Sequence, residues 1–126
     1  ELGLEPLARL VAYAQHAQDP EWFTTAPAEA VGKLLHKVGK KVADIDLFEI
    51  NEAFAVVALA VADRLGVARE KLNVNGGAVA LGHPIGMTGT RLILTAIYEL
   101  RRRGGGTAVC SPCIGGGEAT AVLIEV

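Results

Sequence analysis

Residues 45–65 read IDLFEINEAFAVVALAVADRL, a short apolar stretch, a polar loop and a longer apolar stretch in direct succession. We predict a strand over Ile45–Ile50 and a helix over Ala53–Leu65, which Gly66 ends because glycine suits the position after a helix. The helix candidate is apolar on every face, so it should be buried on every face. Since a domain of 126 residues has difficulty wrapping a helix completely, we expect this helix to lie between this domain and another one.

The segments on either side alternate between strand-like and helical patterns. The other predicted elements are strands over Ala8–Ala14, Lys71–Val74, Thr107–Cys110 and Ala119–Val126, and helices over Ala28–Lys40 and near Thr88–Arg103. The last two strands flank a tight Gly115–Gly117 turn and should pair as an antiparallel hairpin. This order predicts one α/β domain over residues 1–126, with a mixed, mostly parallel sheet, one antiparallel strand and helices on both faces.

Composition limits the classes of partner and compartment. The formal net charge is −2 with mixed signs, which favours neither nucleic acid nor an anionic membrane as a partner. Two cysteines make no disulfide scaffold, so we expect a reducing, cytoplasmic location.

The longest apolar run, Ala53–Ala62, is too short to span a bilayer. The chain begins with Glu1 and its only methionine is Met87, so we expect a piece of a longer reading frame, with any targeting signal outside it.

Three polar or glycine-rich stretches each follow a predicted strand directly. They are Asn51–Ala55, Asn75–Arg91 and Cys113–Gly117. Ligands of open α/β sheets bind at the carboxyl ends of the strands. We therefore expect the three stretches to meet at one shared site.

Three common kinds of site can be set aside on sequence pattern. Neither G-x-G-x-x-G nor G-x-x-x-x-G-K-[ST] occurs, so the glycines around His83 are not a nucleotide-binding fingerprint. Cys110–Cys113 is formally a C-x-x-C, but the glycines that follow cannot open the helix that a redox-active thiolate needs. Zinc would need two further ligands, and the three histidines stand at unpatterned spacings. We interpret Cys110 as a core residue, whereas Cys113 stands at a strand end beside a flexible loop.

Taken singly, the polar residues leave structural roles open. A lone histidine such as His83 is more often structural than catalytic. Asn51 suits the N-cap of the helix that starts near Ala53, and Glu52 suits a charge in its first turn. Arg101–Arg103 suits the solvated end of a helix, with phosphate binding as the less favoured alternative.

As an ordered set, the three stretches resemble the thiolase family. Asn51–Phe54 matches N-E-A-F, Asn75–Gly86 matches N-G-G-A…G-H-P-x-G, and Cys113–Gly117 matches C-x-G-G-G. The resemblance covers essentially the whole chain in order and spacing, including Asp46–Glu49 before the first motif. It implies two similar α/β halves with helices packed between their sheets, of which this chain would be the C-terminal half.

The resemblance also implies roles for individual residues. In the family, a nucleophilic cysteine of the N-terminal half, which this chain does not contain, takes an acyl group from a coenzyme A (CoA) thioester. His83 would activate that cysteine and, with a water held by Asn51, polarise the thioester oxygen. Cys113 would move the α-proton as acid and base, and the backbone N–H of Gly115 would serve a second oxyanion hole. Ala53 and Phe54 would line the pantetheine and acyl pocket.

The implied reaction is the condensation of two acetyl-CoA molecules to acetoacetyl-CoA, or the reverse thiolysis of a 3-ketoacyl-CoA. It needs no metal or cofactor besides the CoA thioester substrate. The implied partners are CoA or acyl-CoA, the N-terminal half, and further copies in a homodimer or homotetramer. The alternative is a non-catalytic, thiolase-like lipid- or acyl-CoA-binding protein or structural subunit. The departures from the family, Met87 and Glu118-Ala119, leave the acyl-chain preference open.

Overall fold

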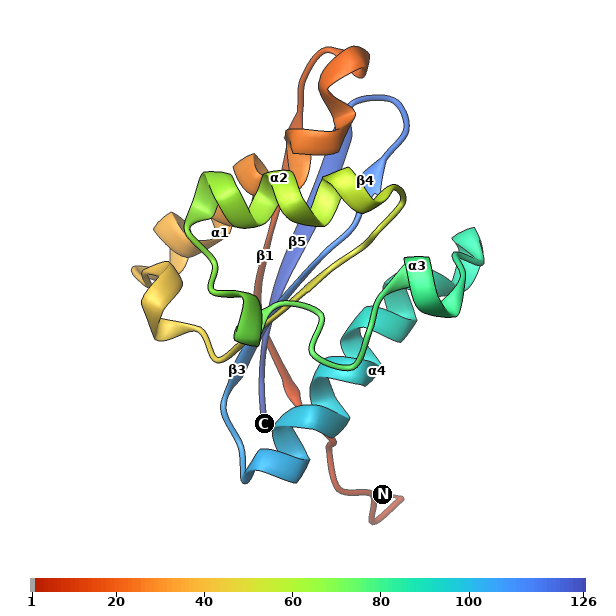
Figure 1. The fold of residues 1–126 in the computed structure, drawn as a ribbon. Helices are drawn as coiled ribbons and strands as arrows, with labels where there is room; N and C mark the ends of the chain where they lie inside the picture. Colours follow the sequence, from red (N-terminus) through yellow and green to blue (C-terminus); the bar gives the residue numbers. More distant parts are fainter. Residues whose placement is uncertain (1) are drawn as a thin grey trace.

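A computed structural model describes residues 2–126 and shows a five-stranded sheet with helices on both faces (Figure 1). Glu1, where the expected domain starts, lies outside the described residues. The strands are β1 (Arg9–Ala17), β2 (Leu47–Ile50), β3 (Thr107–Ser111), β4 (Cys113–Ile114) and β5 (Glu118–Glu125). The α-helices are α1 (Ala26–Val38), α2 (Ala55–Leu65), α3 (Ala78–Leu81) and α4 (Ile85–Arg103). Three 3-10 turns connect them, η1 (Pro20–Thr25), η2 (Val42–Asp44) and η3 (Arg69–Lys71). Within residues 2–126 no helix is long and apolar enough to cross a membrane.

The sheet has the strand order β1-β5-β3-β2, and β4 pairs with the beginning of β5. β2 and β3 are parallel, whereas β5 is antiparallel to β1, β3 and β4. The predicted single reversed strand and the hairpin are therefore confirmed, with Cys110 opposite Val122 in the β3–β5 ladder. Four of the five strands run in the same direction, as predicted, but the reversed strand β5 lies in the middle, between β1 and β3, so that most ladders are antiparallel. The tight turn before Glu118 returns the chain directly alongside β3, and β1 then adds to the free side of β5.

Helices α1 and α2 cover one face of the sheet. Leu34 of α1 and Val57 of α2 share a buried core with Phe48, Val109 and Leu123 of the strands. Alanines at inward positions of β5 leave α1 room to lie close to the sheet.

Helix α4 covers the opposite face, over β2 and β3. Leu92, Ala96 and Leu100 pack against Leu47 and Ala108 of these strands, as expected from the apolar stripe of the helix. The helix ends at Gly104, which has a φ of +92°.

Helix α2 is covered on one side only within this chain. Val57, Ala58 and Val61 are buried, whereas Val56 and Leu59 remain 53% and 58% exposed. The expectation that another domain covers the opposite side therefore stays a prediction.

The predicted strand over Lys71–Val74 is wrong. Only Leu72 forms an isolated bridge, parallel to Phe48, and η3 occupies the residues before it. The next residue, Asn73, has a φ of +45°, which interrupts an extended strand.

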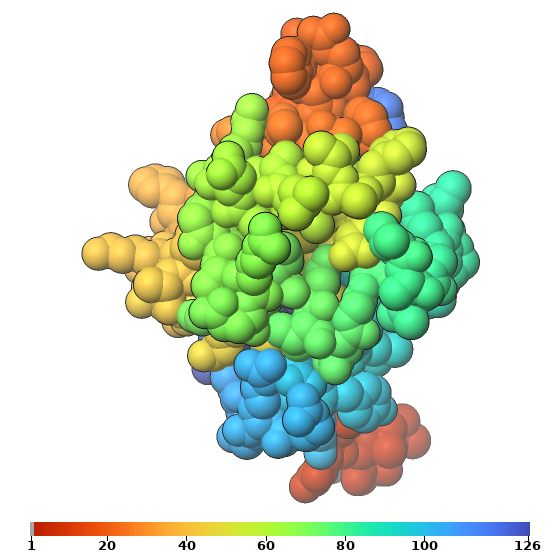
Figure 2. Space-filling model, viewed as in Figure 1, coloured from red at the N-terminus to blue at the C-terminus, as the bar shows by residue number. Residues whose placement is uncertain are grey.

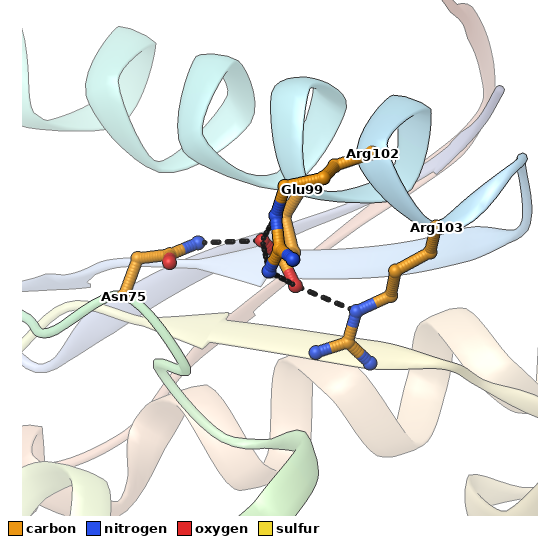
Figure 3. A network of polar contacts seen from close by, with 4 residues as sticks. All are labelled: Asn75, Glu99, Arg102 and Arg103. Atoms are coloured by element: carbon orange, nitrogen blue, oxygen red, sulfur yellow. Dashed lines mark hydrogen bonds and ion pairs between the residues drawn. The ribbon is translucent and has the colours of Figure 1, made fainter.

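A buried carboxylate near the end of α4 anchors the loop that follows Asn73 (Figure 3). Glu99 accepts hydrogen bonds from Asn75 Nδ2 at 3.1 Å, from Arg102 at 2.6 Å and from Arg103 Nε at 2.6 Å. These donors, Arg102 first, lower the pKa of Glu99 to about 2. Two of the three terminal arginines are thus paired with Glu99 as well as placed at a helix end.

Candidate active site

Asn51 directly follows β2, and its backbone extends the strand pairing because its N–H donates to the Ser111 carbonyl at 3.0 Å. Its side chain is buried, and its Nδ2 lies 3.3 Å from His83 Nε2. Helix α2 begins only at Ala55, with Phe54 at the cap position and no side-chain cap. The helix-cap interpretation of Asn51 is therefore wrong, and the side chain contacts His83 instead.

His83 lies between α3 and α4, and its ring is held on two sides. Its Nδ1 is 2.7 Å from the hydroxyl of Thr88, a buried residue in the first turns of α4. That hydroxyl donates its single hydrogen to the Pro84 carbonyl at 3.1 Å, so it accepts from His83, and Nδ1 carries the ring hydrogen. Nε2 then keeps its lone pair and accepts from Asn51 Nδ2. This tautomer, assigned from the hydrogen bonds, makes Nε2 the basic nitrogen.

The backbone before His83 is also held in place. The Gly82 carbonyl accepts from Arg91 Nη1 at 2.6 Å, and the Gly82 N–H donates to the Ala78 carbonyl at 2.8 Å. Gly82 has a φ of +86°, a conformation that favours glycine. The position of His83 is thus set from both α3 and α4.

The two cysteines lie in different surroundings, and both are free thiols. Cys110 of β3 is buried in the core under α4, as predicted, and burial strongly raises the pKa of its thiol. Cys113 of β4 lies opposite Ala119 and is only partly buried, and that burial also raises its thiol pKa. Both thiols are therefore protonated at neutral pH. Within residues 2–126 no group of three or more His, Cys, Asp or Glu side chains is placed to hold a metal.

A cavity of about 670 Å³ brings the predicted residues together. Five of them line it, namely Ala53, Phe54, His83, Cys113 and Gly115. Asn51 does not line it but reaches it through its contact with His83. The expectation of one shared site at the strand ends is therefore met by the geometry. The roles of these residues stay predictions.

Among the residues of the cavity wall that sequence reasoning did not name, two make informative contacts. Phe23 of η1 packs edge-on against Phe54, with ring centroids 6.1 Å apart. Thr88 orients the ring of His83. A threonine in the first turn of a helix, five residues after the histidine, was the available signal for Thr88. Phe23 lies in a segment interpreted as a loop, and nothing in its spacing indicated the site.

An acidic side chain lies buried beneath the site. Glu49 stands opposite Cys110 in the β2–β3 ladder, and only 2% of it is exposed. Burial raises its pKa to about 7, against the opposing charge of Arg91. It does not line the cavity.

Comparisons with known proteins agree with the geometry. The chain is 50% identical over 126 residues to acetyl-CoA acetyltransferase 2 of Arabidopsis thaliana, and the aligned region covers all of this chain and 31% of that protein. It is 52% identical over 125 residues to the probable acetyl-CoA acetyltransferase of Dictyostelium discoideum, covering 99% of this chain and 30% of that protein. It thus spans less than a third of the length of these curated relatives.

Solved structures and a family model extend the comparison. The Bacillus anthracis acetyl-CoA acetyltransferase superimposes with a TM-score of 0.94 at 50% identity, over 98% of this chain and 31% of that one. The human mitochondrial 3-ketoacyl-CoA thiolase in complex with CoA gives 0.93 at 49% identity, over 96% of this chain and 31% of that one. The family model described as the thiolase C-terminal domain matches residues 4–126. Because this match covers nearly the whole sequence, the chain belongs to the thiolase family and forms its C-terminal domain.

Proposed function

We propose that this chain is the catalytic C-terminal half of a thiolase and acts with an N-terminal half that supplies the nucleophilic cysteine. One observation carries the proposal: His83, Cys113 and Gly115 line a single cavity, and Asn51 contacts His83 at 3.3 Å. A non-catalytic carrier or structural subunit has no need for this arrangement. Acyl transfer is therefore better supported than lipid or acyl-CoA carriage.

The first step is acylation of the nucleophile. A free thiol with a pKa of about 8.5 is mostly protonated at neutral pH, so the nucleophilic cysteine needs a base. His83 Nε2, which carries the lone pair in the assigned tautomer, takes this proton. The resulting thiolate attacks the thioester carbon, and CoA leaves as a thiolate that takes the thiol proton of Cys113, while His83 keeps the proton of the nucleophile on Nε2.

The second step is carbon–carbon bond formation. Cys113, as thiolate, removes the α-proton of a second acyl-CoA, and the raised pKa of its thiol makes that thiolate a stronger base. Hydrogen bonds at Asn51 and His83 stabilise the charge on the thioester oxygen. The carbanion attacks the acyl carbon, the Gly115 N–H stabilises the new oxyanion, and the nucleophilic thiolate leaves and takes its proton back from His83. Thiolysis is the reverse sequence, in which Cys113 returns the proton.

The substrate class follows from the same proposal. The human thiolase of the comparison was determined in complex with CoA, which supports CoA thioesters as ligands of this site. Condensation and thiolysis use the same residues, so both directions belong to the proposal. A homodimer or homotetramer, which rests on the family resemblance, and a cytoplasmic location, which rests on the low cysteine content, complete it.

The proposal is tested in the full-length protein that contains this chain. His83→Ala should slow acylation by about 10²–10⁴-fold, the range for loss of a general base. The measurement is the burst of CoA release, together with the mass of the acyl-enzyme. His36→Ala, which removes an exposed histidine of α1, is the matched control and should leave the burst unchanged. A normal burst in His83→Ala, or no acyl-enzyme in the unmodified protein, would contradict the proposal.

A further inference from the structure

The carboxylate of Glu52, next to Asn51 in the chain, joins two segments that are far apart in sequence. Its Oε1 accepts from Asn73 Nδ2 at 3.1 Å, and its Oε2 accepts from the backbone N–H of Val79 at 2.9 Å. Val79 belongs to α3, which leads within four residues to His83. The interpretation of Glu52 as a first-turn charge on α2 is therefore wrong. Its carboxylate holds the start of α3 to the end of β2.

Asn73 completes the link to β2. Its Oδ1 accepts from the Ile50 N–H at 2.8 Å, and its Nδ2 donates to the Ile50 carbonyl at 2.9 Å. The side chain thus supplies the pair of hydrogen bonds that a neighbouring strand would supply. Ile50 directly precedes Asn51, so the same network fixes the backbone from which Asn51 extends.

Gly77 shows how closely Glu52 approaches the loop. Gly77 has a φ of −125°, an extended conformation that any residue adopts. A Cβ atom added at this position would nevertheless overlap the carboxylate of Glu52. A side chain at position 77 would therefore have to displace the carboxylate of Glu52, although the backbone itself would accept one.

We infer that Glu52 is a positioning residue, which holds α3 and the loop to His83 at the end of β2 and so sets the contact between Asn51 and His83. Glu52 does not line the active-site cavity; it lines a separate hollow of about 590 Å³ with α2 and η3. Figure 2 shows this face of the molecule, with α2 (yellow-green) beside the segment that follows it (green) and with α3 (teal). Glu52 therefore acts through His83 and not on substrate. The inference rests on the proposed function, since this contact matters to catalysis only if His83 and Asn51 act in acyl transfer.

The first test replaces Glu52 in the full-length protein. Glu52→Ala should lower the rate of acylation by about 10–100-fold, because small displacements of a catalytic group cost this much, and leave KM for acetyl-CoA within about twofold. Rates are measured per folded molecule, below the unfolding transition followed by circular dichroism. Asp63→Asn is the control, because Asp63 is an exposed carboxylate that lines the same hollow, and it should behave as the unmodified protein.

Two double-mutant cycles then separate positioning from stability. Gly77→Ala alone should reproduce the loss, since its methyl group displaces the carboxylate, but should add little to Glu52→Ala. In the second cycle, Glu52→Ala should lower the acylation rate of His83→Ala by less than about twofold. The reason is that a residue that acts by positioning His83 has no effect once the His83 side chain is removed.

The outcomes that overturn the inference are distinct. Normal acylation per folded molecule in Glu52→Ala, with only a lowered Tm, would show that Glu52 is structural and not a positioning residue. Additive losses in the cycle with His83 would show that it acts by another route. Absence of acyl-enzyme in the unmodified protein would overturn the proposed function and the inference together, whereas either of the first two results leaves the proposed function standing.

Discussion

Cys110 and Cys113 are two free thiols three residues apart, and their different surroundings predict different phenotypes. Cys113→Ser in the full-length protein should form acyl-enzyme but lose exchange of the acyl-CoA α-hydrogens with deuterated solvent by at least about 10²-fold, because a hydroxyl replaces the thiol that moves the proton. The measurement is deuterium incorporation followed by mass spectrometry.

Cys110→Ser is the internal control for this experiment. It places a hydroxyl in an apolar core, so it should lower Tm and leave exchange per folded molecule intact. Exchange that survives in Cys113→Ser and vanishes in Cys110→Ser would reverse the assignment of the two residues.

At the residue scale, the sequence predicted which residues line the cavity, but it did not predict the hydrogen bonds that hold them in place. Cys113 and Gly115 follow a strand, and Ala53 and His83 lie on loops that the sheet brings to the same cavity, so chain order sufficed to place them together. The contact between Glu52 and Val79 spans 27 residues and depends on the path of the intervening loop. No period or motif encodes that path, and such contacts could not be predicted.

At the element scale, the place of β5 in the sheet and the structure of residues 71–74 could not be predicted, and both have the same cause. Periodicity identified which segments are apolar and extended, but it does not specify the neighbours of a strand. The reversed direction of β5 was therefore predicted, but its central place in the sheet was not. Residues 71–74 were predicted as a strand, whereas the side chain of Asn73 makes the hydrogen bonds to the Ile50 backbone that a strand would make. Helices α1 and α4 were predicted within a few residues of their ends, because their apolar stripes are local signals and the glycines from Gly104 stop α4.

The junction of α4 with the loop at Asn75 predicts a pH dependence of stability (Figure 3). The pKa of Glu99 is lowered from 4.5, the ordinary value for glutamate, to about 2. Its contribution to the free energy of unfolding is therefore fully present above pH 4.5 and is lost as the pH falls from 4.5 through about 2. Glu99→Gln should lower Tm by roughly 2–4 °C at pH 7, the shift for about 1 kcal/mol in a domain of moderate size, and by progressively less below pH 4.

Glu125→Gln is the matched control, measured by calorimetry of the same full-length protein. Its carboxylate pairs with Arg9 at 2.6 Å, as closely as the Glu99 pair, but it lies 47% exposed and should contribute little. An equal loss of Tm in both variants, or a loss in Glu99→Gln that does not depend on pH, would contradict the role of the buried network.

At the scale of the whole molecule, apolar side chains remain exposed on helices α2 and α4, besides those of the short helix α3. Val56 and Leu59 face outward from α2, and Leu94 and Tyr98 face outward from α4 at 41% and 61% exposure. The two helices lie on opposite faces of the sheet, so either could be the surface that another domain covers. Apolar periodicity favoured α2, but it does not show which side of a helix the sheet already covers.

The isolated 126-residue chain should therefore self-associate and should form no acyl-enzyme. Exposed apolar patches favour association, and neither free thiol has the predicted role of the nucleophile. Light scattering of the unmodified chain is compared with that of Leu59→Lys and Leu94→Lys, which place a charge on the exposed faces of α2 and α4. If the α2 face drives association, Leu59→Lys should restore the monomer and Leu94→Lys should not. The reverse result would show that α4 is the helix that needs a cover, and a monodisperse unmodified monomer would count against both. Incorporation of acetyl groups from acetyl-CoA by the isolated chain would contradict the need for an N-terminal half.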